Sequence, residues 1–113
     1  MRLPYAGHAV IDPAKLRDYV LSPQHPVGRF KAAFFAQLGY STANWVRLDL
    51  ELRRLAMEGT AELAERNSFG QKYVVRGRIL GQAGRTANVV SVWIILNDED
   101  IPRFVTVFPG AHS

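Results

Sequence analysis

The spacing of the apolar residues changes once along the chain, at Gly59. Before Gly59 apolar residues recur at intervals of three and four, which is the period of an amphipathic α-helix. After it they alternate with other residues, and clusters of glycine and asparagine divide the sequence into pieces of strand length. A helical half followed by a half of short strands predicts an α+β domain.

Three helices are expected in the first half. Asp12 is a suitable N-cap for the first, with Pro13 at the first helical position. Gly39 can end the second in a left-handed cap, and Ser41 or Thr42 can cap the third. The predicted helices span residues 13–21, residues 26–38, and the segment from about residue 42 to residue 58.

Four strands are expected after Gly59, connected by short polar loops. Connections this short leave no room for crossover helices, so the strands should form an antiparallel meander with the N-terminal helices packed on one face. The predicted strands span residues 60–65, 72–80, 86–96 and 103–108. Residues 1–113 then form a single domain, as expected for a chain of this length.

The alternation also predicts which side chains face the helices. On the second strand Lys72, Arg76 and Arg78 share a face with Val74, so this cationic face should be open. The third strand is apolar on both sides, and its two faces are divided as follows. Val90, Val92, Ile94 and Leu96 are assigned to the core, and Val89, Ser91, Trp93 and Ile95 to the open face. On the last strand either alternating set could point inward.

Composition narrows the classes of function. The chain has no cysteine, which excludes a thiolate nucleophile and cysteine-ligated metal sites. His8, His25 and His112 lack ligand spacing, so neither a metal site nor a cofactor is predicted. Without a signal-peptide pattern or a membrane-spanning apolar segment, the chain is expected to be cytoplasmic and not bound to a membrane.

The net charge of +4 favours an anionic partner such as RNA, although a mildly basic domain without an anionic ligand is equally compatible. Lys72, Arg76, Arg78 and Arg103, with Trp93 available for stacking on bases, are the candidate RNA-binding residues of the sheet. The alternative is that Trp93 belongs to the core and that the cations are ordinary solvated strand residues.

His25 is the strongest catalytic candidate, because it stands at the start of the second predicted helix, shortly before Arg29 and Lys31. A histidine there could act as a general base, while the cations bind a phosphate and stabilise negative charge in the transition state. Arg29 would then contact RNA. The alternative is that His25 caps the helix and that both cations lie on its solvated side.

Two motifs resemble a family of small uncharacterised bacterial domains: His-Pro-x-Gly-x-x-Lys at residues 25–31 and Pro-Arg-x-Val-Thr at residues 102–106. The order of helices and strands also resembles the barnase, colicin D and RelE-like toxin ribonucleases. This resemblance implies metal-independent RNA cleavage, with His25 as base or acid, Lys31 at the phosphate and Thr106 as a hydroxyl contact.

The same resemblance implies a toxin–antitoxin setting, in which a small cognate antitoxin protein covers the active face. Two other functions remain open. The chain could be a non-catalytic module that binds RNA or a protein, or it could be an immunity or antitoxin-like protein, for which its basic charge is less suitable.

Overall fold

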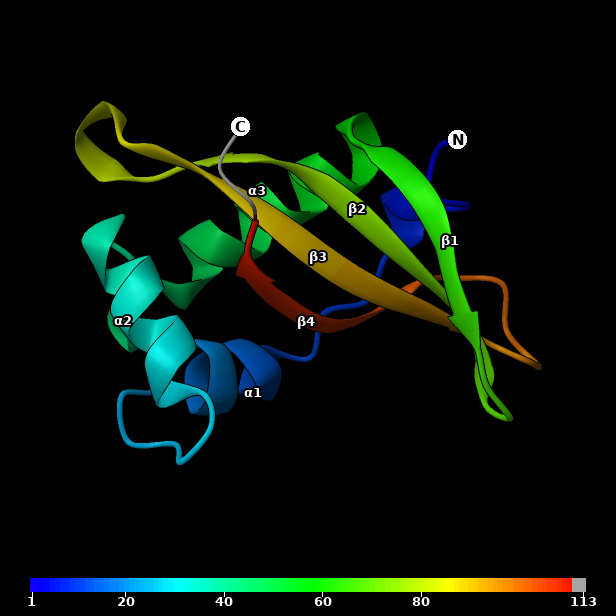
Figure 1. The fold of residues 1–113 in the computed structure, drawn as a ribbon, viewed down its shortest axis with the longest axis horizontal. Helices are drawn as coiled ribbons and strands as arrows, with labels where there is room; N and C mark the ends of the chain where they lie inside the picture. The colour runs from blue at the N-terminus through cyan, green and yellow to red at the C-terminus, as the bar shows by residue number, and fades with distance from the viewer. Residues whose placement is uncertain (111–113) are drawn as a thin grey trace.

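The computed structural model describes residues 1–110 of the chain. Helical segments occupy the first half and strands the second (Figure 1). The helical segments are η1 (Ala6–His8), α1 (Pro13–Lys15), η2 (Leu16–Val20), α2 (Arg29–Gln37), η3 (Thr42–Asn44) and α3 (Trp45–Glu58), with a further short turn, η4 (Gln82–Gly84), between two strands. The strands are β1 (Thr60–Arg66), β2 (Gly70–Leu80), β3 (Thr86–Leu96) and β4 (Arg103–Pro109).

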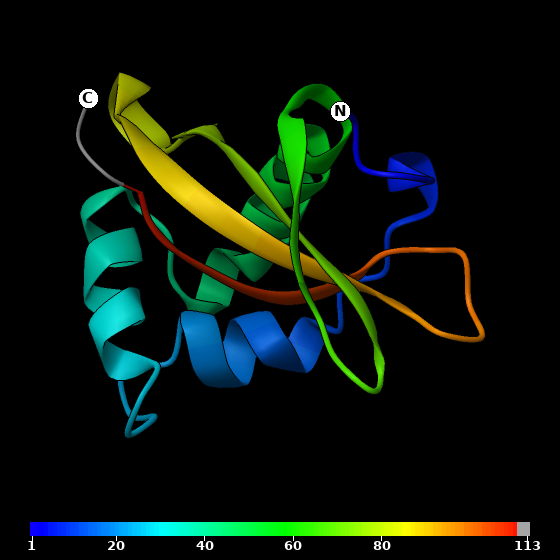
Figure 2. The same ribbon diagram turned by 45° about the vertical axis from the view of Figure 1, so that its right-hand side comes forward.

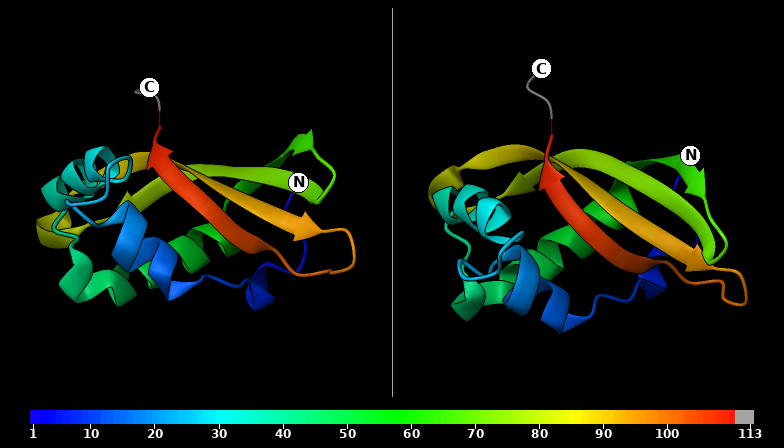
Figure 3. Two further views of the ribbon diagram at one scale, coloured as in Figure 1. Left: turned by 90° about the horizontal axis from the view of Figure 1, so that it is seen from below. Right: turned by 60° about the horizontal axis from the view of Figure 1, so that its bottom comes forward.

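The strands form one antiparallel sheet in the order β1-β2-β3-β4, so each strand pairs with the next in sequence. The helices lie on one face of this sheet, as the view from below shows (Figure 3). The predicted α+β fold with an antiparallel meander is therefore confirmed.

The helices begin where local capping allows. The Asp12 side chain accepts the N–H of Ala14 at 3.0 Å, and α1 continues directly into the π-helical segment η2. Ser41 and Asn44 form a reciprocal capping box before α3. The second helix starts at Arg29, three residues later than predicted, because residues 25–28 form a separate turn.

The core lies between α3, η2, α2 and the inner face of the sheet. Its fully buried side chains include Phe35, Leu48, Val75 and Trp93. The indole N–H of Trp93 donates to the Ser91 hydroxyl at 2.9 Å, and that hydroxyl donates to the carbonyl of Val75 at 3.0 Å. Because of these two hydrogen bonds, the buried Ser91 hydroxyl and the Trp93 N–H both have hydrogen-bond partners.

The face assignment of β3 was wrong. Val89, Ser91 and Trp93 point into the core, and the set assigned to the core, Val90, Val92, Ile94 and Leu96, lies on the opposite face. The strand register explains the reversal, because Val92 pairs with Val74 and Val90 pairs with Arg76. Residues directly opposite one another share a face, so this set had to follow the cationic side of β2. The prediction that the cationic side faces away from the helices holds.

Strand β4 contains an irregularity that no alternating pattern describes. Phe104 and Val107 are both buried although they are three residues apart. The pairing shifts between Trp93↔Phe104 and Val92↔Thr106, which leaves Val105 as an extra residue in a β-bulge. Neither alternating set therefore points inward as a whole.

Glu51 connects α3 to the end of β2. Its carboxylate accepts hydrogen bonds from the Arg54 guanidinium at 3.0 and 3.1 Å and from the backbone N–H of Leu80 at 2.7 Å. The hydrogen bond from Arg54, followed by that from Leu80, holds the pKa of Glu51 below its usual value. A carboxyl with a lowered pKa in the folded state stabilises the fold at neutral pH and loses this contribution as the pH falls through that pKa.

We predict that Glu51→Gln lowers the free energy of unfolding by about 1–2 kcal/mol at neutral pH, because charged hydrogen bonds are replaced by neutral ones. The difference from the wild type should narrow as acid protonates Glu51 in the wild type. Urea unfolding at several pH values measures both effects.

Glu58→Gln is the matched control, since Glu58 contacts the same Arg54 at 3.6 Å from an exposed position. It should change the free energy of unfolding by less than about 0.5 kcal/mol. Equal losses in the two variants would contradict the role assigned to Glu51.

Candidate functional site

A cluster of polar side chains lies where the helical layer meets the edge strand β4. The Lys31 ammonium, on α2, donates to the Tyr19 hydroxyl at 2.9 Å and to the Thr106 hydroxyl at 2.6 Å. The His25 ring stands edge-on to the Tyr19 ring, with 4.8 Å between centroids. We call Tyr19, His25, Lys31 and Thr106 the edge cluster. The three residues that the resemblance identified are thus brought together, with Tyr19 as the link.

The position of His25 follows from the turn that it forms. The N–H groups of Val27 and Gly28 donate to its Nδ1 at 3.0 and 2.9 Å, and the N–H of Arg29 donates to its carbonyl at 3.0 Å. These bonds satisfy donors that the start of a helix leaves without intrahelical partners. An accepting Nδ1 carries no proton, so the ring proton lies on Nε2. In this arrangement His25 caps α2, and its Nδ1 is occupied by these two N–H donors and cannot also act as a base.

Gly28 allows α2 to approach η2 closely. A Cβ atom at this position would overlap the backbone carbonyl of Tyr19. Gly28 itself is buried. The glycine in His-Pro-x-Gly-x-x-Lys is therefore a packing requirement that brings Lys31 within reach of Tyr19.

Lys31 has no carboxylate partner in the part of the chain that the structure describes, and its ammonium lies 4.7 Å from the centre of the Tyr19 ring. An ammonium has three donors, and two are used by the hydroxyls. Each hydroxyl accepts from Lys31, so its own proton remains available. The ammonium of Lys15 lies nearby, donating to the carbonyl of Val105 at 3.3 Å. The edge cluster therefore offers several donors and positive charge, which suits an anion.

Tyr19 is the member of the edge cluster that the sequence did not predict. In the sequence it belongs to the apolar stripe of the first helix, and its spacing gave no reason to separate it from Leu16 and Val20. The available signal was its hydroxyl, because a partly buried tyrosine usually needs a hydrogen-bond partner.

The cations predicted on the open sheet face are largely neutralised. Lys72 pairs with Glu65 at 3.1 Å and Arg76 with Glu62 at 3.9 Å. Arg103 makes two hydrogen bonds to Glu99, at 2.7 and 2.8 Å. That pairing raises the pKa of Arg103 and lowers the pKa of Glu99. The open face is thus not a continuous positive surface.

The remaining predicted RNA contacts have different surroundings. Trp93 has 0% exposure, so it cannot stack on a base; the alternative, that it belongs to the core, is correct. Arg78 is exposed and makes no ion pair within residues 1–110. Arg29 is exposed beside the edge cluster, with its guanidinium 4.9 Å from the centre of the Phe30 ring.

Metal binding and membrane association are the next two questions that the structure bears on. No three histidine, aspartate or glutamate side chains gather as a metal-ligand set within residues 1–110. None of the helices in the same part of the chain combines the length and apolarity needed to cross a bilayer.

Comparison with known proteins gives a family and a fold. A family model described as a domain of unknown function, DUF6883, matches residues 2–111. No curated protein sequence matches. The fold is similar to a chain in the solved structure of a contact-dependent growth inhibition toxin–immunity protein complex from Klebsiella pneumoniae 342, with a TM-score of 0.69 and 16% identity. The similarity covers 95% of this chain and 97% of that one.

We predict that Gly28→Ala destabilises the protein by about 1–3 kcal/mol, because the new methyl group forces α2 away from the Tyr19 carbonyl. Thermal unfolding with chemical denaturation would measure the loss. Gly7→Ala is the control: a Cβ at Gly7 meets nothing within 4 Å, so its stability should stay within about 0.5 kcal/mol of the wild type. Similar stability of the two variants would disprove the packing role of Gly28.

Proposed function

The chain belongs to the DUF6883 family, a domain of unknown function, and we propose that it is a toxin-type, metal-independent endoribonuclease whose active site is the edge cluster. One observation carries the proposal: Lys31 is partly buried between two hydroxyl groups, and no carboxylate among residues 1–110 neutralises it. A scissile phosphate would supply the missing negative charge. The similarity in fold to a chain of a toxin–immunity protein complex supports the toxin setting.

Phosphate recognition needs donors that converge on non-bridging oxygens. Lys31 contributes its third N–H and Thr106 its hydroxyl proton, while the Tyr19 hydroxyl proton remains for the leaving oxygen, since both hydroxyl oxygens already accept from Lys31. Arg29, exposed on the same helix, adds positive charge for the neighbouring backbone. Such donors are fixed before the substrate arrives, which makes them effective at stabilising developing charge.

The proposed reaction is an internal transesterification. The 2′-oxygen of the RNA attacks the adjacent phosphorus, the bond from phosphorus to the 5′-oxygen breaks, and the products end in a 2′,3′-cyclic phosphate and a 5′-hydroxyl. Lys31 and Thr106 stabilise the charge on the phosphorane oxygens. Tyr19 gives its proton to the leaving 5′-oxygen and is reprotonated by water, and the 2′-hydroxyl proton passes to water.

His25 is a positioning residue in this proposal. Its ring contacts Tyr19 edge-on, and its Nδ1 fixes the turn from which α2 and Lys31 begin. This assignment replaces the sequence-based expectation of His25 as the general base. A toxin of this kind would be held inactive by a cognate partner protein that covers the edge cluster.

The test is cleavage of purified RNA in the presence of EDTA. Wild-type protein should give products with 2′,3′-cyclic phosphate ends. Lys31→Met should lower kcat about 100- to 1,000-fold through lost charge stabilisation, and Tyr19→Phe about 100-fold through the lost proton donor. Thr106→Val should lower kcat less, because Lys31 remains.

Lys72→Met is the matched control, since it removes an ammonium from the sheet face where Glu65 already pairs with it. Its activity should equal that of the wild type. Induced expression should arrest growth for the wild type and for Lys72→Met, and not for Lys31→Met. If the wild type cleaves no RNA and arrests no growth, the enzyme proposal fails.

The solved complex contains both a toxin and an immunity protein, so the immunity-like alternative has its own readout. An immunity-type protein would leave RNA intact and would protect cells from a cognate toxin on co-expression. A binding module would retain RNA affinity that weakens with salt, without turnover.

A further inference from the structure

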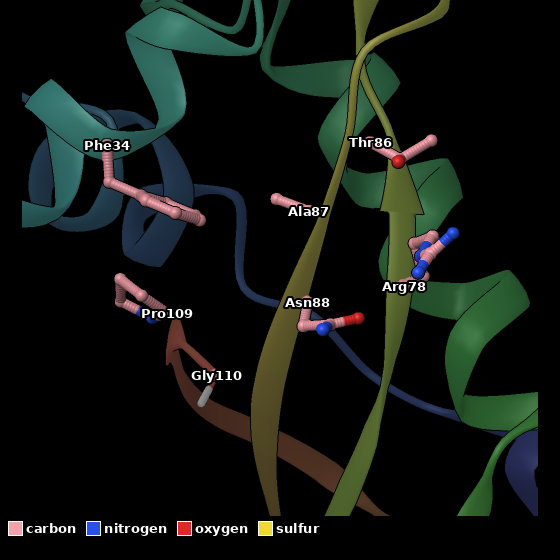
Figure 4. Close-up of a pocket in the computed structure, with 7 residues that line it drawn as sticks. All are labelled: Phe34, Arg78, Thr86, Ala87, Asn88, Pro109 and Gly110. Atoms are coloured by element: carbon pink, nitrogen blue, oxygen red, sulfur yellow. The ribbon is translucent and has the colours of Figure 1, made fainter. Parts of the chain in front are cut away.

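A hollow of about 320 Å³ lies between α2 and the β2–β3 hairpin, lined by Phe34, Arg78, Thr86, Asn88 and Pro109 among others (Figure 4). The hollow exists because β4 ends at Pro109, opposite Val89, while β3 starts three residues earlier at Thr86. The hairpin therefore extends past the edge strand, and α2 lies beside its uncovered edge (Figure 2). The volume is near the lower end for a small-molecule site.

We propose that this hollow is a subsite for one nucleotide flanking the scissile bond of single-stranded RNA; the inference rests on the proposed ribonuclease function. Its lining combines three kinds of group that a nucleotide needs. Arg78 is exposed and unpaired within the described residues, so it can bind a phosphate. The Phe34 ring projects from α2 toward β3, where it gives a base an aromatic surface.

Asn88 adds a polar group for the edge of the base. It lies directly opposite Arg78 in the strand register, and its amide extends toward Arg78 in Figure 4. An amide both donates and accepts hydrogen bonds, as the base edges do. None of the carboxylates within residues 1–110 lines the hollow. An RNA segment fits this combination better than a neutral or cationic ligand would.

The hollow also has the right position relative to the edge cluster. Phe34 follows Lys31 by about one turn of α2, and Pro109 follows Thr106 by three residues, roughly 10 Å along β4. Two of the elements that form the edge cluster, α2 and β4, thus continue into the hollow in the same direction. A chain bound at Lys31 and Thr106 would reach Arg78 with a neighbouring nucleotide.

The experiment measures binding and cleavage separately. The binding probe is a short, fluorescein-labelled, single-stranded oligonucleotide with 2′-O-methyl groups, which the proposed reaction cannot cleave. Arg78→Gln should weaken its affinity roughly tenfold. The slope of log Kd against log salt should decrease by about 0.7, the amount expected when one phosphate contact to a single strand is lost.

Cleavage of substrates of different length shows whether Arg78 acts at the hollow or at the scissile bond. Arg78→Gln should leave the cleavage of a dinucleotide unchanged, since a dinucleotide does not reach the hollow, and should slow the cleavage of the longer unmodified oligonucleotide. Arg66→Gln is the matched control: Arg66 lies on β1 and donates to Asn97 at 3.1 Å, away from the hollow. It should bind and cleave like the wild type.

The outcomes separate the two proposals. One outcome is that Arg78→Gln binds the oligonucleotide as tightly as the wild type, whereas Lys31→Met binds it more weakly. This result would overturn the proposed subsite and leave the proposed active site in place. The same wild-type affinity would also be the result if a protein occupied the hollow instead of RNA. The opposite outcome is that the wild type cleaves no RNA, whereas Arg78→Gln binds the oligonucleotide roughly tenfold more weakly than the wild type. This result would overturn the proposed ribonuclease activity and retain the proposed nucleotide-binding site.

Discussion

The contact of Lys31 with Tyr19 and Thr106 joins η2, α2 and β4, three segments that are distant in sequence. Each partner is neutral, so the contact satisfies two of the ammonium's donors without neutralising its charge. The surrounding structure supports this arrangement: Gly28 lets α2 approach Tyr19, and the turn capped by His25 sets where α2 starts. This arrangement leaves the Lys31 ammonium without a carboxylate partner among residues 1–110.

The bulge in β4 supplies the third member of that contact. By adding Val105 to the strand, it lets both Phe104 and Val107 enter the core, and Thr106 between them remains within reach of Lys31. Bulges often occur on edge strands next to functional sites, where they redirect a side chain. The core and the edge cluster therefore depend on the same local irregularity.

Charge is distributed unevenly over the molecule. Carboxylates from β1 and the β3–β4 loop pair with most cations of the sheet face, whereas Lys31, Arg29 and Arg78 make no ion pair within residues 1–110. Surface ion pairs contribute little to stability, but they cancel the local field that an anion would experience. The net charge of the chain thus does not show where an anion would be attracted. The positions of the unpaired cations show this instead.

The sequence by itself determined the α+β class, the order of helices and strands, and the open cationic side of β2, because hydrophobic period and turn residues act locally. It also pointed to His25, Lys31 and Thr106, through motifs. Only the tertiary structure decided which face of β3 is buried, since a strand that is apolar on both sides takes its orientation from its neighbours. The tertiary structure likewise decided the bulge in β4 and the place of Tyr19 in the edge cluster, because both depend on contacts between segments far apart in sequence. It also showed that His25 caps α2.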